Sequence, residues 1–226
     1  MRPARESMAT RVARFSALWS CSLVLLVACS GGSDGKLPPV SVEPTDEVPV
    51  TPARPASREW RRMDIDQLKA SIARVSGGIR WIENDATGQP FDVLDSLAGS
   101  LGKPDFLNSN TEDLEPGLLF QKFLDDAASA VCTSWVAREQ QQARSQRLLV
   151  SQAEFSDTPT SAPAAIEANM RALLLRFHGM SVGPGDATLT PWLGLFQKVW
   201  QGQGSTSAAW RTVCIALFIH PDFYTF

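Results

Sequence analysis

From residue 58 to its end, the chain carries apolar residues at intervals of three and four positions, the spacing of one face of an α-helix. No stretch shows the two-residue alternation that predicts a half-buried strand. Glycine and proline interrupt the helical spacing, for example at Gly77, Gly102 and Pro221. We therefore expect residues 58–226 to form an all-α domain, an irregular bundle of five or six helices.

The individual helices can be placed from these interruptions. A helix that begins after residue 64 should stop at Gly77, and the longest helix should bury Phe120, Leu124 and Trp135 and lose its apolar face after Arg138. The expected helical segments are 64–77, 91–106, 115–149, 157–179, 190–202 and a last one that starts after 205–207 and ends before Pro221.

The segment before this domain has a different composition. Residues 29–57 contain six prolines and only scattered apolar residues, so we expect a disordered, semi-extended tether. The whole chain is 44% hydrophobic and 20% charged, as in ordinary globular proteins.

The first 28 residues have the pattern of a secretory signal peptide. Arg11 and Arg14 precede an apolar run from about residue 15 to residue 27, which is shorter than the roughly 20 residues of a membrane-spanning helix. Met1 and Met8 are both plausible starts. The pattern predicts export of the chain.

The end of the apolar run resembles the lipobox of bacterial lipoproteins, with Leu26, Val27 and Ala28 before Cys29. The resemblance implies cleavage between Ala28 and Cys29 and a covalent lipid on the Cys29 thiol, which anchors the protein to a membrane of the cell envelope. Ser30 at the next position is similar to cargo sorted to the outer membrane. The alternative is an ordinary secretory signal with a cysteine nearby by chance.

Two cysteines remain in the exported domain once Cys21 and Cys29 are set aside. Cys132 shares a helical face with Leu124 and Trp135, and Cys214 shares one with Trp210 and Leu217. Because thiols of exported proteins meet an oxidising environment, we expect a disulfide between Cys132 and Cys214. Two buried free thiols are the alternative.

Candidate catalytic and metal-binding residues are few. His178 and His220 each fall at the end of a helix, where an imidazolium suits the helix dipole and can bond the last carbonyls. A metal or haem site that combines them with Met170 or Met180 is the weaker alternative, because no recognised metal motif accompanies them. We therefore predict no metal, no cofactor besides the lipid on Cys29, and no catalytic residue.

Acidic and aromatic residues also have structural explanations. The acids Glu112, Asp113 and Glu115 precede the longest helix and are expected to complement its dipole. Trp192 and Trp200 are four-residue neighbours of Phe196, so a core stripe is favoured over an exposed face that binds glycans.

Charge argues against nucleic acid as a partner. The chain has 24 acidic and 21 basic residues, and the signal peptide removes more basic than acidic ones. An acidic exported domain does not neutralise phosphates.

Segments 101–132, 171–179 and 209–226 resemble parts of uncharacterised myxobacterial surface lipoproteins, a likeness of general pattern that transfers no catalytic residue. We expect a lipid-anchored binding or accessory module for another envelope protein, with no small-molecule ligand identified. The alternative is a small exported enzyme: a cleft holding His178, His220 and a carboxylate would favour it, and a flat apolar patch would favour the binding module.

Overall fold

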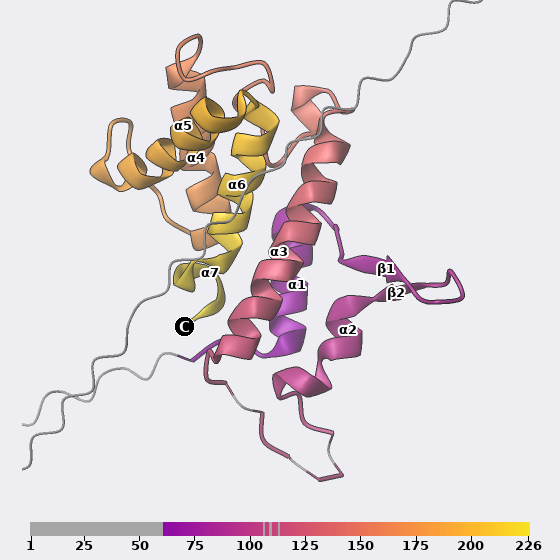
Figure 1. Ribbon diagram of the computed structural model, residues 1–226. Helices are drawn as coiled ribbons and strands as arrows, with labels where there is room; N and C mark the ends of the chain where they lie inside the picture. The colour runs from indigo at the N-terminus through magenta and orange to yellow at the C-terminus, as the bar shows by residue number, and fades with distance from the viewer. Residues whose placement is uncertain (1–60, 106, 109, 113) are drawn as a thin grey trace, which may run out of the picture. The chain divides into compact units, whose positions relative to one another are not determined.

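The computed structural model describes residues 61–226 with the exception of 106, 109 and 113. Within this range the chain forms seven α-helices and one antiparallel pair of strands (Figure 1). The predicted all-α class is confirmed. The expected signal peptide, Ala28, Cys29 and the tether lie outside the described residues. The elements are α1 (Ile65–Ser76), β1 (Ile82–Asn84), β2 (Pro90–Asp92), α2 (Val93–Leu97), α3 (Leu118–Glu139), α4 (Pro163–His178), α5 (Thr190–Gln203), α6 (Thr206–Ile219) and α7 (Pro221–Tyr224).

Helix α1 has clear boundary signals at both of its ends. The Asp64 carboxylate accepts the backbone N–H of Gln67, and the Gln67 side chain accepts the N–H of Asp64, which together form a capping box. Gly77 ends the helix with a φ of 67°, a conformation that glycine adopts without steric cost. The helix therefore begins and ends where the sequence predicts.

The core is built around α6. This helix packs most extensively against α3 and α5 and also contacts α4. Figure 1 shows α6 between the long α3 on one side and the α4–α5 pair on the other. The faces assigned from sequence are buried: Phe120, Leu124 and Trp135 of α3 are all less than 5% exposed.

The two cysteines of the domain meet at the contact between α3 and α6. Their sulfur atoms lie 1.99 Å apart, a disulfide distance, with the Cα atoms 5.9 Å apart. Both residues are fully buried. The link joins positions 82 residues apart in sequence and so fastens the longest helix to the central one.

One small sheet corrects the expectation that the domain has no strand. Strands β1 and β2 form a hairpin in which Glu83 pairs with Phe91. The Asp85 carboxylate organises its turn by accepting the backbone N–H groups of Thr87 and Gln89, and Gly88 has a φ of 82°. Each strand has three residues, mostly exposed, so no alternation was available to reveal it.

The predicted third helical segment also ends earlier than expected. Helix α3 stops at Glu139, and the residues after it follow a loop in which Leu149 and Val150 are fully buried. The buried Glu139 carboxylate holds this loop by accepting the N–H groups of Leu148, Leu149 and Val150 at 2.7 to 2.9 Å.

The first and last described residues lie side by side. Arg62 and Thr225 form an antiparallel bridge, the N–H of Met63 donates to the carbonyl of Tyr224 at 2.7 Å, and the N–H of Phe226 donates to the carbonyl of Arg61. Phe223 and Tyr224 are buried, so the aromatic residues at the end of the chain pack back onto the helices, while Phe226 is exposed.

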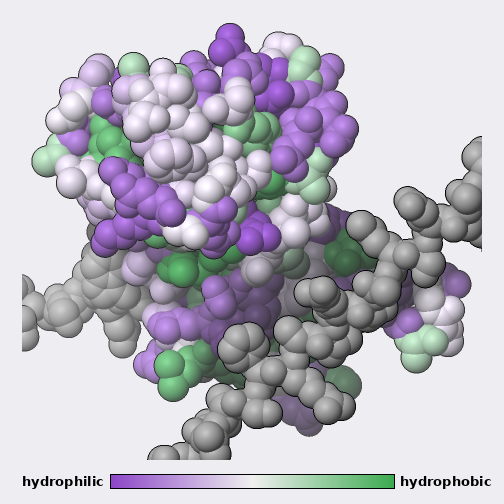
Figure 2. All heavy atoms as spheres, turned by 45° about the horizontal axis from the view of Figure 1, so that its top comes forward, coloured by the Kyte–Doolittle hydropathy of each residue, from purple (hydrophilic) through white to green (hydrophobic). Residues whose placement is uncertain are grey.

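The face in Figure 2 shows small separate apolar patches among polar residues. Among residues 61–226, with the three gaps noted above, no helix combines the length and the hydropathy needed to cross a bilayer.

Candidate functional site

Two histidines from different helices meet at one end of the bundle. His178 is the last residue of α4, and His220 stands between α6 and α7, where it ends one helix and caps the other. Their positions at helix ends agree with the sequence analysis. The structure adds that the two rings stack, with centroids 4.9 Å apart and an interplanar angle of 30°.

Asp222 is the third member of this cluster. It lies in the first turn of α7, and its Oδ2 is 3.5 Å from Nδ1 of His220. One potential ligand atom from each of His178, His220 and Asp222 lies within 4.8 Å of the others. The metal site considered from sequence combined the histidines with Met170 or Met180 and did not include Asp222. Pro221 begins the helical turn that brings Asp222 back to His220.

Hydrogen bonding fixes the form of the His178 ring. Its Nε2 is 3.1 Å from the carbonyl oxygen of Leu217, one of the last four carbonyls of α6. Because a carbonyl only accepts, Nε2 carries the proton, and in the neutral ring Nδ1 keeps a free lone pair. A bond from this histidine to a helix-terminal carbonyl is predicted from sequence, and the structure shows that the carbonyl belongs to another helix, α6.

Burial opposes the expected imidazolium form of His178. Desolvation lowers the pKa of His178 below 6.5, and the neighbouring His220 lowers it further. The bond to Leu217 and the charge of Asp222 raise the pKa, but burial prevails. The ring is therefore neutral at pH 7.

Trp192 forms a wall of the cluster. This residue belongs to the first turns of α5, and its ring centroid lies 5.8 Å from that of His178 and 5.6 Å from that of His220. Trp192 and Trp200 are half-buried and pack against the core, and Phe196 between them is buried. The imidazoles thus have an indole and a carboxylate as neighbours.

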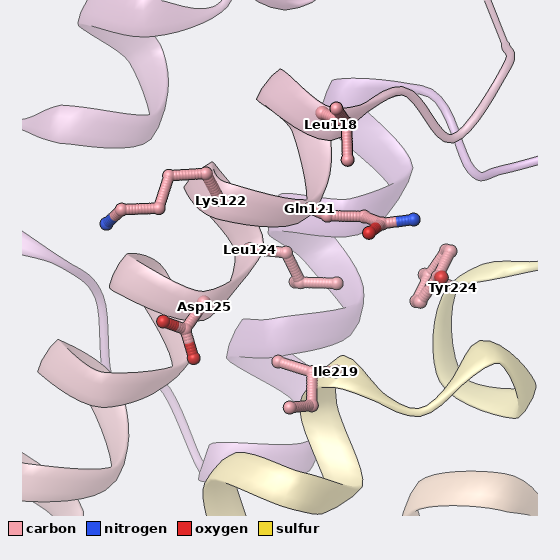
Figure 3. Close-up of a pocket in the computed structure, with 7 residues that line it drawn as sticks. All are labelled: Leu118, Gln121, Lys122, Leu124, Asp125, Ile219 and Tyr224. Atoms are coloured by element: carbon pink, nitrogen blue, oxygen red, sulfur yellow. The ribbon is translucent and has the colours of Figure 1, made fainter. Parts of the chain in front are cut away.

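A hollow of about 450 Å³ lies between the first turns of α3 and the α6–α7 junction. Figure 3 shows Leu124 and Ile219 facing each other across it, with Lys122 and Asp125 on one side and Gln121 and Tyr224 on the other. We call this hollow, lined by Leu118, Gln121, Lys122, Leu124, Asp125, Ile219 and Tyr224, the α3 groove.

Exposed aliphatic side chains lie at the start of α3 and at the end of α6. Leu118 is 85% exposed, Leu119 is 62% exposed and Ile219 is 41% exposed. Leu119 borders a second hollow on the other side of the same helical turn, next to Leu101 and Phe120. The beginning of α3 thus presents apolar surface that the core of the domain does not use.

The acidic residues ahead of α3 act differently from the expectation. Glu112 does not cap α3, whose N-cap is Gly117. Its carboxylate instead accepts the N–H of Ile65 at 3.2 Å at the start of α1 and lies 3.4 Å from Nη1 of Arg62. Asp113 lies outside the described residues.

Comparisons with protein-family models, with curated proteins and with solved structures gave no significant match.

Proposed function

We propose that the chain is a lipid-anchored protein of the bacterial cell envelope whose helical domain binds another envelope protein through the α3 groove. The anchor in this proposal is the lipid on Cys29, supported by Leu26, Val27 and Ala28 before it and by the apolar run that precedes them. The following 29–57 segment supplies a spacer between membrane and domain.

The single observation that carries the binding role is the exposed aliphatic surface at the start of α3. Leu118 projects almost fully into solvent beside a hollow whose floor contains Leu124, which is 1% exposed. Exposed aliphatic side chains next to an apolar hollow are typical of a surface that a partner covers.

The shape of the α3 groove favours one kind of occupant, an amphipathic helix with leucine-sized side chains. The hollow of about 450 Å³ has room for a few such side chains. Lys122 and Asp125 at the rim can meet polar groups on the flanks of such a helix. The rim charges of both signs fit a partner whose polar face is also mixed in sign.

A crosslinking experiment in intact cells tests this proposal. A photoreactive benzoylphenylalanine replaces Gln121 at the rim of the groove, and in a matched strain it replaces Ser129, an exposed position farther along α3. We expect a single heavy adduct from position 121, none from position 129, and loss of the adduct when Leu118→Asp is added. Leu118→Asp should not affect folding because the side chain is exposed.

The partner peptide in the adduct identifies the occupant. An adduct on an apolar face of a helical segment supports the proposal. An adduct that persists with Leu118→Asp, that forms equally from position 129, or that lies on a polar loop contradicts it.

The anchor is tested separately by metabolic labelling with radioactive palmitate. We expect label on the wild-type protein, no label on Cys29→Ala, and movement of that variant from the membrane to the soluble fraction. A labelled Cys29→Ala variant, or one that fractionates like the wild type, would contradict the anchor.

The alternative of a small exported enzyme has its own supporting observation, the convergence of His178, His220 and Asp222. The ring of His178 is already engaged by the Leu217 carbonyl, and Nδ1 of His220 accepts the N–H of Asp222 at 3.3 Å. Each ring thus has one nitrogen bonded to a backbone group, and these bonds orient the two imidazoles.

A further inference from the structure

We propose that His178, His220 and Asp222 form a binding site for a divalent transition metal ion of the zinc class. This site is separate from the α3 groove and does not depend on the proposed partner. It rests on the side-chain arrangement at the ends of α4 and α6 and the start of α7.

The ligand set consists of two imidazole nitrogens and one carboxylate oxygen. Imidazole suits Zn²⁺, Ni²⁺ and Cu²⁺, whereas Mg²⁺ and Ca²⁺ prefer sites made of oxygen. Three protein ligands also leave one position of a tetrahedral zinc ion open for water or another molecule.

His178 is prepared to act as a ligand. The Nε2–H of His178 donates a hydrogen bond to the Leu217 carbonyl, and this bond holds the ring and leaves Nδ1 as the metal-binding atom. In metal sites a backbone carbonyl commonly accepts a hydrogen bond from the ring nitrogen of histidine that does not bind the metal. The neutral ring needs no deprotonation to bind metal at pH 7.

The distances permit closure around an ion. Ligand atoms about 2.1 Å from a tetrahedral zinc ion are roughly 3.4 Å from one another. One nitrogen of each ring and one oxygen of Asp222 lie within 4.8 Å of one another, so closure needs shifts of about 1 Å and a turn of the stacked rings that directs their lone pairs at one ion. The side chains of His220 and Asp222 are each 41% exposed, which leaves them room to make those movements.

Trp192 and two helix C-termini form the surroundings of the proposed metal site. The indole lies against both rings, with its centroid 5.8 Å from that of His178 and 5.6 Å from that of His220. The negative ends of the α4 and α6 dipoles also favour a cation near His178 and His220.

The test is calorimetric titration of the full-length protein, purified from membranes in detergent and first dialysed against a chelator. We expect one Zn²⁺ per chain and no heat from Mg²⁺ at the same concentration. Asp222→Asn and His178→Gln should each weaken zinc binding about tenfold or more. Asp66→Asn is the matched control, because Asp66 is also an exposed acid in the first turn of a helix.

A second readout locates the ion. Cu²⁺ or Ni²⁺ bound at this site should quench the fluorescence of Trp192, so the quenching should fall sharply in Trp192→Phe. Asp222→Asn has an exposed side chain and preserves the shape of the residue, so it tests the site even if His178→Gln does not fold.

Either of two results would overturn the proposal. The first is that the wild-type protein gives no heat of zinc binding, and the second is that Asp222→Asn binds zinc as tightly as the control Asp66→Asn. Neither result bears on the crosslink at position 121. Absence of the adduct from position 121 would contradict the proposed partner and would not affect the proposed metal site.

Discussion

Glu139 is the residue on which the longest loop of the domain depends. It is fully buried, and its carboxylate accepts bonds from three backbone N–H groups and from the indole nitrogen of Trp135, the last at 2.6 Å. Asn169 of α4 continues the same network by donating to the carbonyl of Leu149 and accepting the N–H of Gln152. A buried charge is retained here because it satisfies several donors at once.

Glu139→Gln should lower the free energy of unfolding by about 2 to 4 kcal/mol. The replacement keeps the size of the side chain but points an NH₂ group at backbone donors that need an acceptor. Urea denaturation monitored by circular dichroism measures the change. The control Glu83→Gln, on an exposed strand, should change stability by no more than about 0.5 kcal/mol. Equal effects of the two variants would contradict this role for Glu139.

Residue-level roles were the hardest to predict from sequence. Glu139 lies at the start of a polar run. No local sequence pattern predicts that residues 148–150 fold back and bond to its carboxylate. The role of Asp222 was equally unpredictable from sequence. It lies near both histidines only because the ends of α4 and α6 lie close together. Both roles arise from contacts between segments that are far apart in the chain.

At the level of elements, the contact between α3 and α6 dominates the bundle. Cys132 and Cys214 sit in its centre, each flanked by fully buried residues of its own helix, Val131 and Val213. A covalent link at this place restricts the unfolded chain over a long loop, and long loops gain most from such a link.

The double variant Cys132→Ala/Cys214→Ala should lower the free energy of unfolding by about 4 to 5 kcal/mol, the chain-entropy value for a loop of this length. Denaturant unfolding of the variant and of the non-reduced wild type measures the difference. Alkylation of the non-reduced, denatured mature protein should label neither cysteine. Labelling of both positions would show that the two thiols are free.

Most helices were predictable because each carries its own boundary signals. Asp64 and Gly77 define α1, Pro163 and Gly179 bracket α4, and apolar spacing supplies the buried faces. The hairpin was not predicted because strands of three mostly exposed residues have no detectable two-residue alternation. The end of α3 was predicted wrongly because it depends on Glu139, whose carboxylate bonds to residues 148–150 rather than to its sequence neighbours.

At the level of the whole molecule, His178 couples stability to pH. Burial holds the pKa of His178 below the 6.5 of the unfolded chain, with His220 lowering it and Asp222 raising it. The unfolded state therefore binds this proton more readily than the folded state, so the contribution of His178 to stability is complete above pH 6.5 and is lost as the pH falls through the lower, folded-state pKa.

We expect the free energy of unfolding of the wild type to decrease between pH 7.5 and pH 5 more steeply than that of His178→Gln, which has no group to titrate there. Urea unfolding at several pH values, in chelator, measures both slopes. Identical slopes would show that this histidine does not couple folding to pH.

The class of fold followed from sequence, but the arrangement of the helices did not. Helical spacing fixes which face of each helix is buried and leaves open which helices touch. The position of α6 between α3 and the α4–α5 pair, and the meeting of α4, α6 and α7 at the histidines, are set by packing that no local pattern encodes.

The bridge between Arg62 and Thr225 determines how the domain would bear a mechanical load. Tension applied to the chain ahead of Arg61 enters at this short antiparallel pairing, beside the last residues of the chain. Rupture would begin with the peeling of these few bonds, while the loop closed by Cys132 and Cys214 adds no contour length until that linkage is reduced. A pulled domain would thus yield first at this pairing, while the disulfide keeps α3 fastened to α6.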